Sequence, residues 1–137
     1  MQWSRRYKTQ KDNPMSFKPE NFAVWSEIPV TDIDRAIKFY DHVFDLELTK
    51  DETGPNPMAM FPTSNSAGVA GHLYPGKPAS DGAGPTVHFA CPDKLETALE
   101  RVGQAGGKVL SDIITIPVGR FAYCLDTEGN SIGVFSL

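Results

Sequence analysis

The first alternation of apolar and polar residues runs from Val24 to Val30, where Ile28 and Val30 share one parity and Glu27 has the other. Successive side chains of a strand point to opposite faces of its sheet, so this pattern predicts a strand with Ile28 and Val30 in a core. Directly afterwards the apolar spacing changes to three and four residues, which is typical of an amphipathic helix capped by Thr31 or Asp32. The apolar positions of this helix are Ile33, Ala36, Ile37, Tyr40, Val43 and Phe44.

Short apolar runs bounded by Gly, Pro, Asn or Ser follow the helix and predict strands over 46–50, 58–61 and 67–74. Residues 75–85, rich in Gly, Pro and Ser, are predicted to form a linker. The same order then returns, with a strand over 86–91, a helix over 93–104 and strands over 108–116, 121–125 and 131–136. Aligning the two halves so that Ile33 falls on Leu95 also places Ala36 on Ala98, which indicates an internal duplication.

This repeated order predicts an α+β fold of two βαβββ modules, over residues 22–75 and 85–137, inside a single domain that spans 21–137. Each helix can cover only one face of its sheet. We therefore expect the uncovered faces to curl around a shared hollow, as a cupped, incompletely closed eight-stranded sheet with the helices outside.

Composition narrows the class of protein. The chain has 137 residues, a formal net charge of −4 and 40% hydrophobic residues. No apolar run reaches the roughly 18 residues of a membrane span, and the acidic balance argues against nucleic acid as a partner. Cys91 and Cys124 lack metal-type or redox-type spacing, which favours free thiols in a reducing cytoplasm. No apolar stretch follows the early Arg and Lys residues, so they do not form a secretory signal. We expect residues 1–20 to be a basic, disordered extension.

Strand parity selects the residues that face the predicted hollow. In the strand over 86–91, Val87 and Phe89 belong to the core face, so Thr86 and His88 face the hollow. The same reasoning places residues from the other strands there, namely Trp25, Glu27, His72, Tyr74 and Phe135. The sequence thus predicts a ligand pocket with aromatic walls and a few polar groups.

Glu27 and His88 are the candidate catalytic pair, because they fall at equivalent positions of the two modules once a one-residue offset is allowed. A carboxylate near an imidazole can act as a general base with an orienting partner. Two other interpretations stay open: a structural hydrogen bond between the modules, or a metal site formed by Glu27, His72 and His88. Arg120, in a predicted loop, either binds an anionic ligand at the mouth of the cup or is a surface charge.

Three segments carry a resemblance to a known family. They are EIPVTDIDRAIKFYDHVF from Glu27 to Phe44, AGGKVL from Ala105 to Leu110, and DTEGNSIGVF from Asp126 to Phe135. With the order of the elements, which covers about residues 22–137, they resemble the vicinal oxygen chelate superfamily of glyoxalases, bleomycin resistance proteins and extradiol dioxygenases. The chain is most similar in character to small bacterial glyoxalase-like proteins. The resemblance implies paired βαβββ modules, a site inside the cup and assembly as a homodimer.

Enzymes of that superfamily hold a divalent metal with one His, Gln or Glu from each of four strands. The resemblance places these positions here at Trp25, at or near His72, at Val87 or Thr86, and at Gly133. Three of the four cannot bind a metal well, since Trp and Gly offer no ligand atom in their side chains. We therefore expect no metal ligands and no cofactor, with a divalent metal as the alternative.

These observations predict a protein that binds a small molecule in an aromatic-lined cup without the usual metal, and that has neither nucleic acid nor membrane as a partner. The predicted ligand-binding residues are Trp25, His72, Tyr74, Thr86, Arg120 and Phe135. The alternative is a lyase, isomerase or dioxygenase that uses Glu27 and His88, with a metal drawn to His72.

Overall fold

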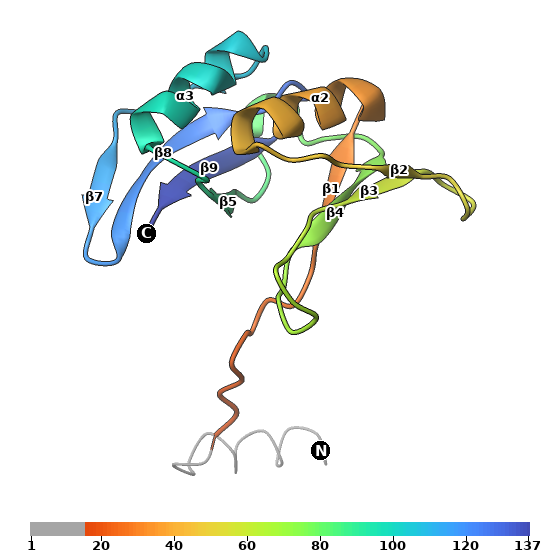
Figure 1. Ribbon diagram of the computed structural model, residues 1–137, viewed down its shortest axis with the longest axis horizontal. Coiled ribbons are helices and arrows are strands. Elements are labelled where there is room, and N and C mark those ends of the chain that lie inside the picture. Colours follow the sequence, from red (N-terminus) through yellow and green to blue (C-terminus); the bar gives the residue numbers. More distant parts are fainter. Residues whose placement is uncertain (1–15) are drawn as a thin grey trace.

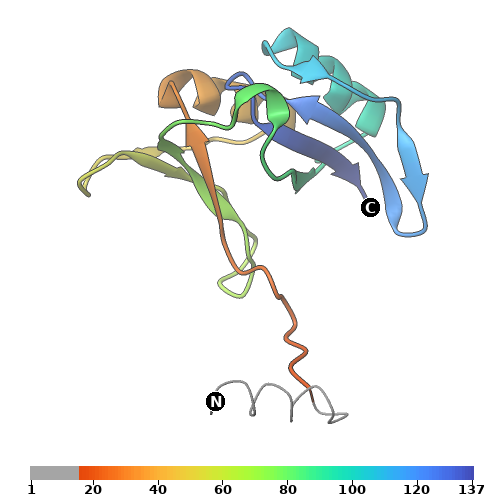
Figure 2. The same cartoon turned by 180° about the vertical axis from the view of Figure 1, so that it is seen from behind.

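The computed structural model describes residues 16–137, which form two sheets with a pair of helices side by side across them (Figure 1). From residue 16 an extended segment that projects from the body of the molecule leads toward the sheets and into the first strand, as the view from behind also shows (Figure 2). The predicted extension over residues 1–20 lies outside the described residues as far as residue 15. Within residues 16–137, no helix combines the length and the apolar character that crossing a membrane requires.

The first module forms a four-stranded sheet in the order β1-β4-β3-β2, with β1 and β4 parallel. Asp32 caps its helix by accepting a hydrogen bond from the Arg35 N–H at 3.1 Å, as predicted. Asp45, in the left-handed conformation at φ 56°, ends the helix. The elements are β1 (Ser26–Val30), α2 (Ile33–Phe44), β2 (Lys50–Asp51), β3 (Met58–Met60) and β4 (Gly71–Pro75).

The second module repeats this arrangement as a sheet in the order β5-β9-β8-β6, with β7 paired to β8. Its first and last strands, β5 and β9, are parallel like β1 and β4. The elements are β5 (Val87–Ala90), α3 (Leu95–Gln104), β6 (Lys108–Val109), β7 (Ile114–Ile116), β8 (Gly119–Leu125) and β9 (Ser131–Ser136). A short 3₁₀ turn, η1 (Ser80–Gly82), lies in the connection predicted as a linker.

One predicted strand is divided in two. The apolar run over 108–116 forms β6 and β7 rather than one strand. Leu110 still donates its N–H to the carbonyl of Tyr123 at 2.8 Å, but the N–H of Tyr123 is bonded to the Ser111 hydroxyl at 2.9 Å. A side chain thus replaces a backbone carbonyl in the ladder and interrupts the strand, in the manner of a bulge. The described residues therefore contain one strand more than the eight predicted.

The duplication predicted from the sequence is visible in the strand registers. Glu27 lies opposite His72 between β1 and β4, and His88 lies opposite Gly133 between β5 and β9. The number of residues between Glu27 and His88 therefore equals the number between His72 and Gly133. The starts of the two helices are one residue further apart. The extra residue lies between β5 and α3, so Glu27 and His88 do occupy equivalent positions.

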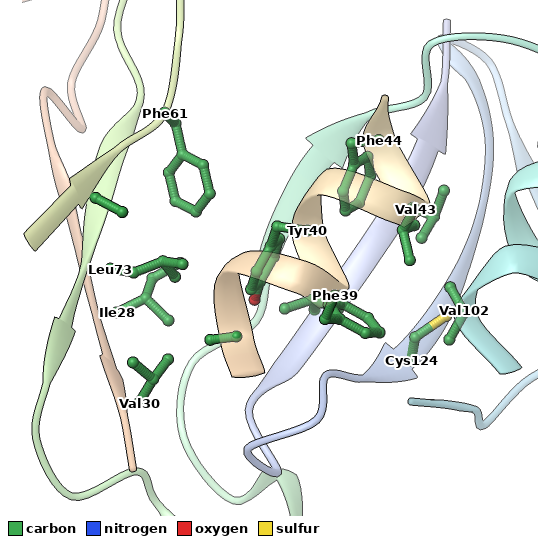
Figure 3. Packing of buried hydrophobic residues seen from close by; sticks show 14 of the residues in the cluster. Ile28, Val30, Phe39, Tyr40, Val43, Phe44, Phe61, Leu73, Val102 and Cys124 are labelled. Atoms are coloured by element: carbon green, nitrogen blue, oxygen red, sulfur yellow. The ribbon is translucent and has the colours of Figure 1, made fainter. Parts of the chain in front are cut away.

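The hydrophobic core extends through both modules, with α2 at its centre (Figure 3). Ile28, Leu73 and Phe61 of the first sheet point toward Tyr40 of α2, while Phe39 and Val43 lie on the side of α2 nearer Val102 and Cys124. Most core positions predicted by strand and helix periodicity, such as Ile28, Val30, Leu95 and Ala98, are buried, whereas Ile37, Val87 and Phe89 are only partly buried. Burial of one face of each sheet against the helices leaves the other face of each sheet uncovered.

The β8–β9 turn, residues 126–130, joins the second module to the first. Buried Asp126 accepts a hydrogen bond from the hydroxyl of Tyr40 at 2.7 Å. Glu128 accepts from Nε and Nη2 of Arg35 at 2.8 and 2.9 Å, and Asn130 donates its amide to the carbonyl of Pro29 at 2.8 Å. The DTEGN motif therefore holds the start of α2 and the end of β1 against the second sheet.

Candidate functional site

The two sheet faces opposite the helices, called here the open faces, carry the residues that strand parity selected. The predicted core residues of the same strands are buried at Leu73, Ile132 and Val134 and partly buried at Val87 and Phe89. The open face of the first sheet presents Trp25, Glu27, Met60, His72 and Tyr74. The open face of the second presents Thr86, His88, Phe121, Tyr123 and Phe135.

On the first open face, Trp25, His72 and Glu27 form a chain of polar contacts, in which the first contact is a hydrogen bond and the second a longer approach. Nε1–H of Trp25 donates to Nδ1 of His72 at 2.9 Å. An indole N–H can only donate, so Nδ1 of His72 is the acceptor and the ring proton lies on Nε2. That Nε2 lies 3.5 Å from Oε1 of Glu27. The imidazole is nearly buried, at 12% side-chain exposure, while the carboxylate is 69% exposed. The Glu27 carboxylate therefore lies between the His72 ring and solvent.

The second open face is an aromatic cluster around His88. The imidazole centroid lies 4.9 Å from that of Phe121, 5.7 Å from that of Phe135 and 5.8 Å from that of Tyr123. Phe121 and Phe135 are stacked at 5.5 Å with an interplanar angle of 4°. Burial against these rings lowers the pKa of His88, so its imidazole is neutral at neutral pH.

The absence of a side chain at Gly133 of β9 allows the His88 ring of β5 to lie over that strand. A Cβ added to Gly133 would overlap Nδ1, Cε1 and Cγ of His88. Gly133 is itself buried, although it lies on the uncovered face of the sheet, because the imidazole takes the place that a side chain would fill. Sequence parity placed both residues on this face, but the absence of a side chain at Gly133 is what determines the position of the ring.

The structure does not pair Glu27 with His88. Glu27 contacts His72 of its own sheet, and His88 contacts the aromatic rings of the second sheet. The interpretation of Glu27 and His88 as a hydrogen bond between the modules gains no support from these contacts. That connection is made instead by the β8–β9 turn, through Asp126, Glu128 and Asn130.

Two further predicted residues have partners of their own. Thr86 is hydrogen-bonded through its hydroxyl to the hydroxyl of Ser131. Arg120, predicted in a loop, is the second residue of β8 and forms an ion pair with Glu96 of α3 at 3.0 Å. Because Phe121 and Tyr123 face the open side, the alternate position of Arg120 directs it to the helix side of the sheet. Arg120 therefore lies apart from the other predicted site residues.

Sequence reasoning missed Phe121, Tyr123 and Met60, which also lie on the open faces. The signal for the first two is the alternation Phe121-Ala122-Tyr123-Cys124, in which small and sulfur-containing residues alternate with aromatic ones. Ala122 and Cys124 are fully buried, as this alternation requires, whereas Tyr123 is 38% exposed. Applying the parity rule to this strand would have identified most of the aromatic wall.

The four positions at which the resemblance places metal ligands do not suit a divalent cation. The strand offset that relates Glu27 to His88 also relates Trp25 to Thr86, so it selects Thr86 over Val87 as the third position. Trp25 donates a proton to one nitrogen of His72, the Thr86 hydroxyl is bonded to Ser131, and Gly133 has no side chain. Within residues 16–137 there is also no group of three or more His, Cys, Asp or Glu close enough together to hold a metal.

A separate cavity of about 560 Å³ lies between the start of β1, parts of the segment between β3 and β4, and β5, against Tyr40 and Phe44 in the C-terminal half of α2. We call it the seam cavity. Its walls include Phe44 of α2, Phe61 and Val69 of the first module, and Phe89 and Cys91 of the second. Of the open-face residues named above, His88 also lines this cavity.

Comparisons with known proteins agree with this architecture. A glyoxylase-like domain-containing protein of Didymella fabae is 31% identical in an alignment of 112 residues, and the match covers 77% of this chain and 85% of the relative. A glyoxalase/bleomycin resistance protein from Albidiferax ferrireducens T118 has a similar structure, with a TM-score of 0.62 at 19% identity over 85% of this chain and 99% of that one. The fosfomycin resistance protein FosX from Mesorhizobium loti has a TM-score of 0.59 at 16% identity over 88% and 94% of the two chains.

The family model of the glyoxalase/bleomycin resistance protein/dioxygenase superfamily matches residues 23–134, a span that begins just before β1 and ends within β9. Its match covers nearly all of both modules. The two-module fold and the sequence thus lead to the same result, and the chain belongs to the glyoxalase/bleomycin resistance protein/dioxygenase superfamily.

Proposed function

We propose that this protein binds a planar, aromatic small molecule on its open faces without a metal ion. The observation that carries the proposal is the aromatic cluster around His88, which covers Gly133 at one of the positions where the resemblance places a metal ligand. Aromatic rings with exposed surface favour flat partners, and each stacked or edge-to-face pair contributes about 0.5–1.5 kcal/mol beyond area burial. Tyr123 and Trp25, at 38% and 45% exposure, supply such surface on the two sheets.

The charges of the open faces indicate the type of ligand. Among the open-face residues named above, Glu27 is the acidic side chain, and His72 and His88 supply two imidazoles. Neither Arg nor Lys is among them, since Arg120 is paired with Glu96 on the helix side. A neutral or cationic ligand therefore fits these faces better than an anionic one.

Ligand screening by thermal shift tests the proposal. A panel of neutral and cationic planar heteroaromatics should include compounds that raise the unfolding temperature, because a ligand at a hundred times its Kd stabilises the fold by about 2.7 kcal/mol. Phe135→Ala should abolish the shift, and Val118→Ala, at a turn residue 66% exposed, should preserve it. A panel without binders, or equal shifts in both variants, would contradict the proposal.

A second candidate function is proton transfer by Glu27 and His72, favoured by the Trp25–His72–Glu27 chain. The indole holds His72 in the tautomer with its proton on Nε2, and the Glu27 carboxylate is positioned to accept or return a proton at the solvent side. Such chemistry suits a lyase or isomerase that removes a proton from carbon. In this candidate function His72 is the partner of Glu27, a role that the sequence analysis gave to His88.

Turnover measurements on matched variants separate this candidate from simple binding. If the reaction occurs, Glu27→Gln should lower kcat by about 10²–10⁴-fold while leaving the unfolding temperature unchanged. Glu47→Gln, at an exposed position between α2 and β2, is the control. Unchanged kcat in Glu27→Gln would leave binding as the function of the open faces.

A further inference from the structure

We propose that the seam cavity is a second binding site, which takes a neutral, apolar, planar molecule. The cavity of about 560 Å³ is far larger than the packing gaps of a protein core, which rarely exceed a water molecule. It falls within the range of small-molecule pockets. Its position beneath α2, between the two modules, separates it from the residues of the open faces apart from His88.

The internal duplication shows that the core is incomplete at this point. Ile28 and Val30 of β1 are 5% and 0% exposed. By the strand offset that relates Glu27 to His88, their equivalents are Phe89 of β5 and Cys91 directly after it, and both are only partly buried. The seam cavity lies against these two residues. A bound apolar molecule would therefore cover the surface that the first module covers with its own side chains.

The lining defines the chemistry of this ligand. Phe89 contacts three rings of the first module, with centroids 5.1 Å away for Phe61, 5.4 Å for Phe44 and 5.5 Å for Tyr40. The hydroxyl of Tyr40 is bonded to Asp126, so its ring offers carbon to the cavity. None of the lining residues is Asp, Glu, Lys or Arg, and the lowered pKa of His88 keeps that ring neutral. A charged ligand would lose hydration without gaining a partner.

The chain provides its own reporter for this site. Its two cysteines differ in access, since Cys91 lines the cavity and is half-buried, whereas Cys124 is fully buried beneath the second sheet. Burial raises the pKa of the Cys91 thiol, so its modification is measured at mildly alkaline pH, where more thiolate is present. A molecule in the seam cavity should shield Cys91 from a disulfide reagent.

The experiment titrates the full chain with N-phenyl-1-naphthylamine, a neutral planar fluorophore, and follows the modification of Cys91 by 5,5′-dithiobis(2-nitrobenzoate). We expect enhanced fluorescence on binding, and modification of Cys91 about tenfold slower at ten times the Kd of the seam cavity, by mass action. The anionic 8-anilinonaphthalene-1-sulfonate should protect less. Cys91→Ala should remove the fast-reacting thiol, which assigns the signal to this residue.

Matched variants locate the probe. Val69→Trp, at a lining residue 41% exposed, should narrow the cavity and weaken both binding and protection, while Val118→Trp at the distant turn should change neither. Tyr123→Ala on the open face should also leave protection unchanged, which distinguishes this site from the proposed open-face site. The proposal is overturned if the probe fails to protect Cys91, if Tyr123→Ala abolishes protection, or if the two Trp variants behave alike. It is likewise overturned if deletion of residues 1–15 exposes Cys91, since the chain itself would then be the occupant.

Discussion

Gly133 and His88 together determine the chemistry of the second open face. A carboxylate or imidazole at position 133 would point outward, and the His88 ring would have to move away from Phe121 and Phe135. With glycine there, the imidazole becomes part of an aromatic wall, and burial lowers its pKa. A single missing side chain thus replaces a potential ligand atom with a stacking surface.

Two Gly→Ala substitutions should have opposite effects on stability. Gly133→Ala forces its Cβ into the His88 ring and should lower the free energy of unfolding by about 1–3 kcal/mol. Gly103→Ala, at a helical position with nothing within 4 Å of the added Cβ, should raise it by about 0.5–1 kcal/mol. Thermal or urea unfolding measures both. The double variant His88→Ala/Gly133→Ala should recover the stability of His88→Ala alone, and failure to do so would show that the clash with His88 is not the cause.

Parity and spacing in the sequence predicted which residues share a face but not which of them touch. The polar residues Glu27, His72 and His88 were placed on the open faces from alternation alone. The hydrogen bond from Trp25 to His72 depends on the register of β4 against β1, which pairs Glu27 with His72. Register is set by packing across strands far apart in the chain, so the periodicity of one strand does not contain it.

Among the elements, the β8–β9 turn carries a group of hydrogen bonds that hold the modules together. Asp126 accepts hydrogen bonds from the N–H groups of Glu128 and Asn130, which fixes the turn, and from Tyr40, which attaches it to α2. Burial and the nearby Asp126 carboxylate raise the pKa of Tyr40 well above its ordinary value, so its hydroxyl remains a donor. The sequence predicted a tight turn here, but not that the turn joins the modules.

The acid sensitivity of the fold should depend on Glu128. Burial acts to raise the pKa of Glu128, but hydrogen bonds from Arg35, the Asp32 N–H and Thr127 outweigh it and hold the pKa below 4.5. A carboxyl whose pKa is lower in the folded state stabilises it above the unfolded-state pKa and loses that contribution as pH falls through the folded-state value. Stability should therefore decline as pH falls below about 4.5, and Glu128→Gln should make this decline shallower, as measured by thermal unfolding against pH.

Glu96 provides a comparison for this loss of stability at acid pH. Its ion pair with Arg120 lowers its pKa from 4.5 to about 2, but both side chains are exposed, at 46% and 39%. Salt screens exposed charges, so the effect of Glu96→Gln on stability at acid pH should disappear at high ionic strength. The Glu128 side chain has no exposed surface, and its effect should persist. Equal salt sensitivity of the two variants would contradict this account.

Across the whole molecule, the open faces leave apolar surface in contact with water. Met60, Trp25 and Tyr123 are 52%, 45% and 38% exposed. Met60 and Trp25 both lie beside His72 on the first open face, and exposed apolar side chains gathered in this way are characteristic of interaction sites. We propose that a second copy of the chain covers the open faces, so that the ligand lies between the aromatic rings and the partner.

Light scattering tests this arrangement, since the chain has a mass of 15.0 kDa and the dimer should have twice that value. Met60→Glu combined with Tyr123→Glu should yield the monomer, because two buried carboxylates without partners oppose association. Val118→Glu introduces the same charge at a site 66% exposed and should leave the dimer intact. A wild-type protein that is a monomer at all concentrations would contradict the proposal.

At the scale of the whole molecule, the sequence predicted two modules and the class of fold, because each module repeats a local order of elements. It did not predict the seam cavity, since this depends on how Phe89 and Cys91 of one half meet Phe44 and Phe61 of the other. The two halves are similar in pattern but differ in packing. Only the three-dimensional arrangement shows where the second half is left partly uncovered.

The connection that contains η1, from Gly76 to Thr86, belongs to neither sheet, because every strand pairs within its own half of the chain. A protease cut there would sever no strand pairing, and the fragments would still share the core around α2 and the bonds of Tyr40, Arg35 and Pro29 to the turn. The halves could then be produced as separate polypeptides and recombined, so that a variant of one half could be assessed against an unaltered copy of the other.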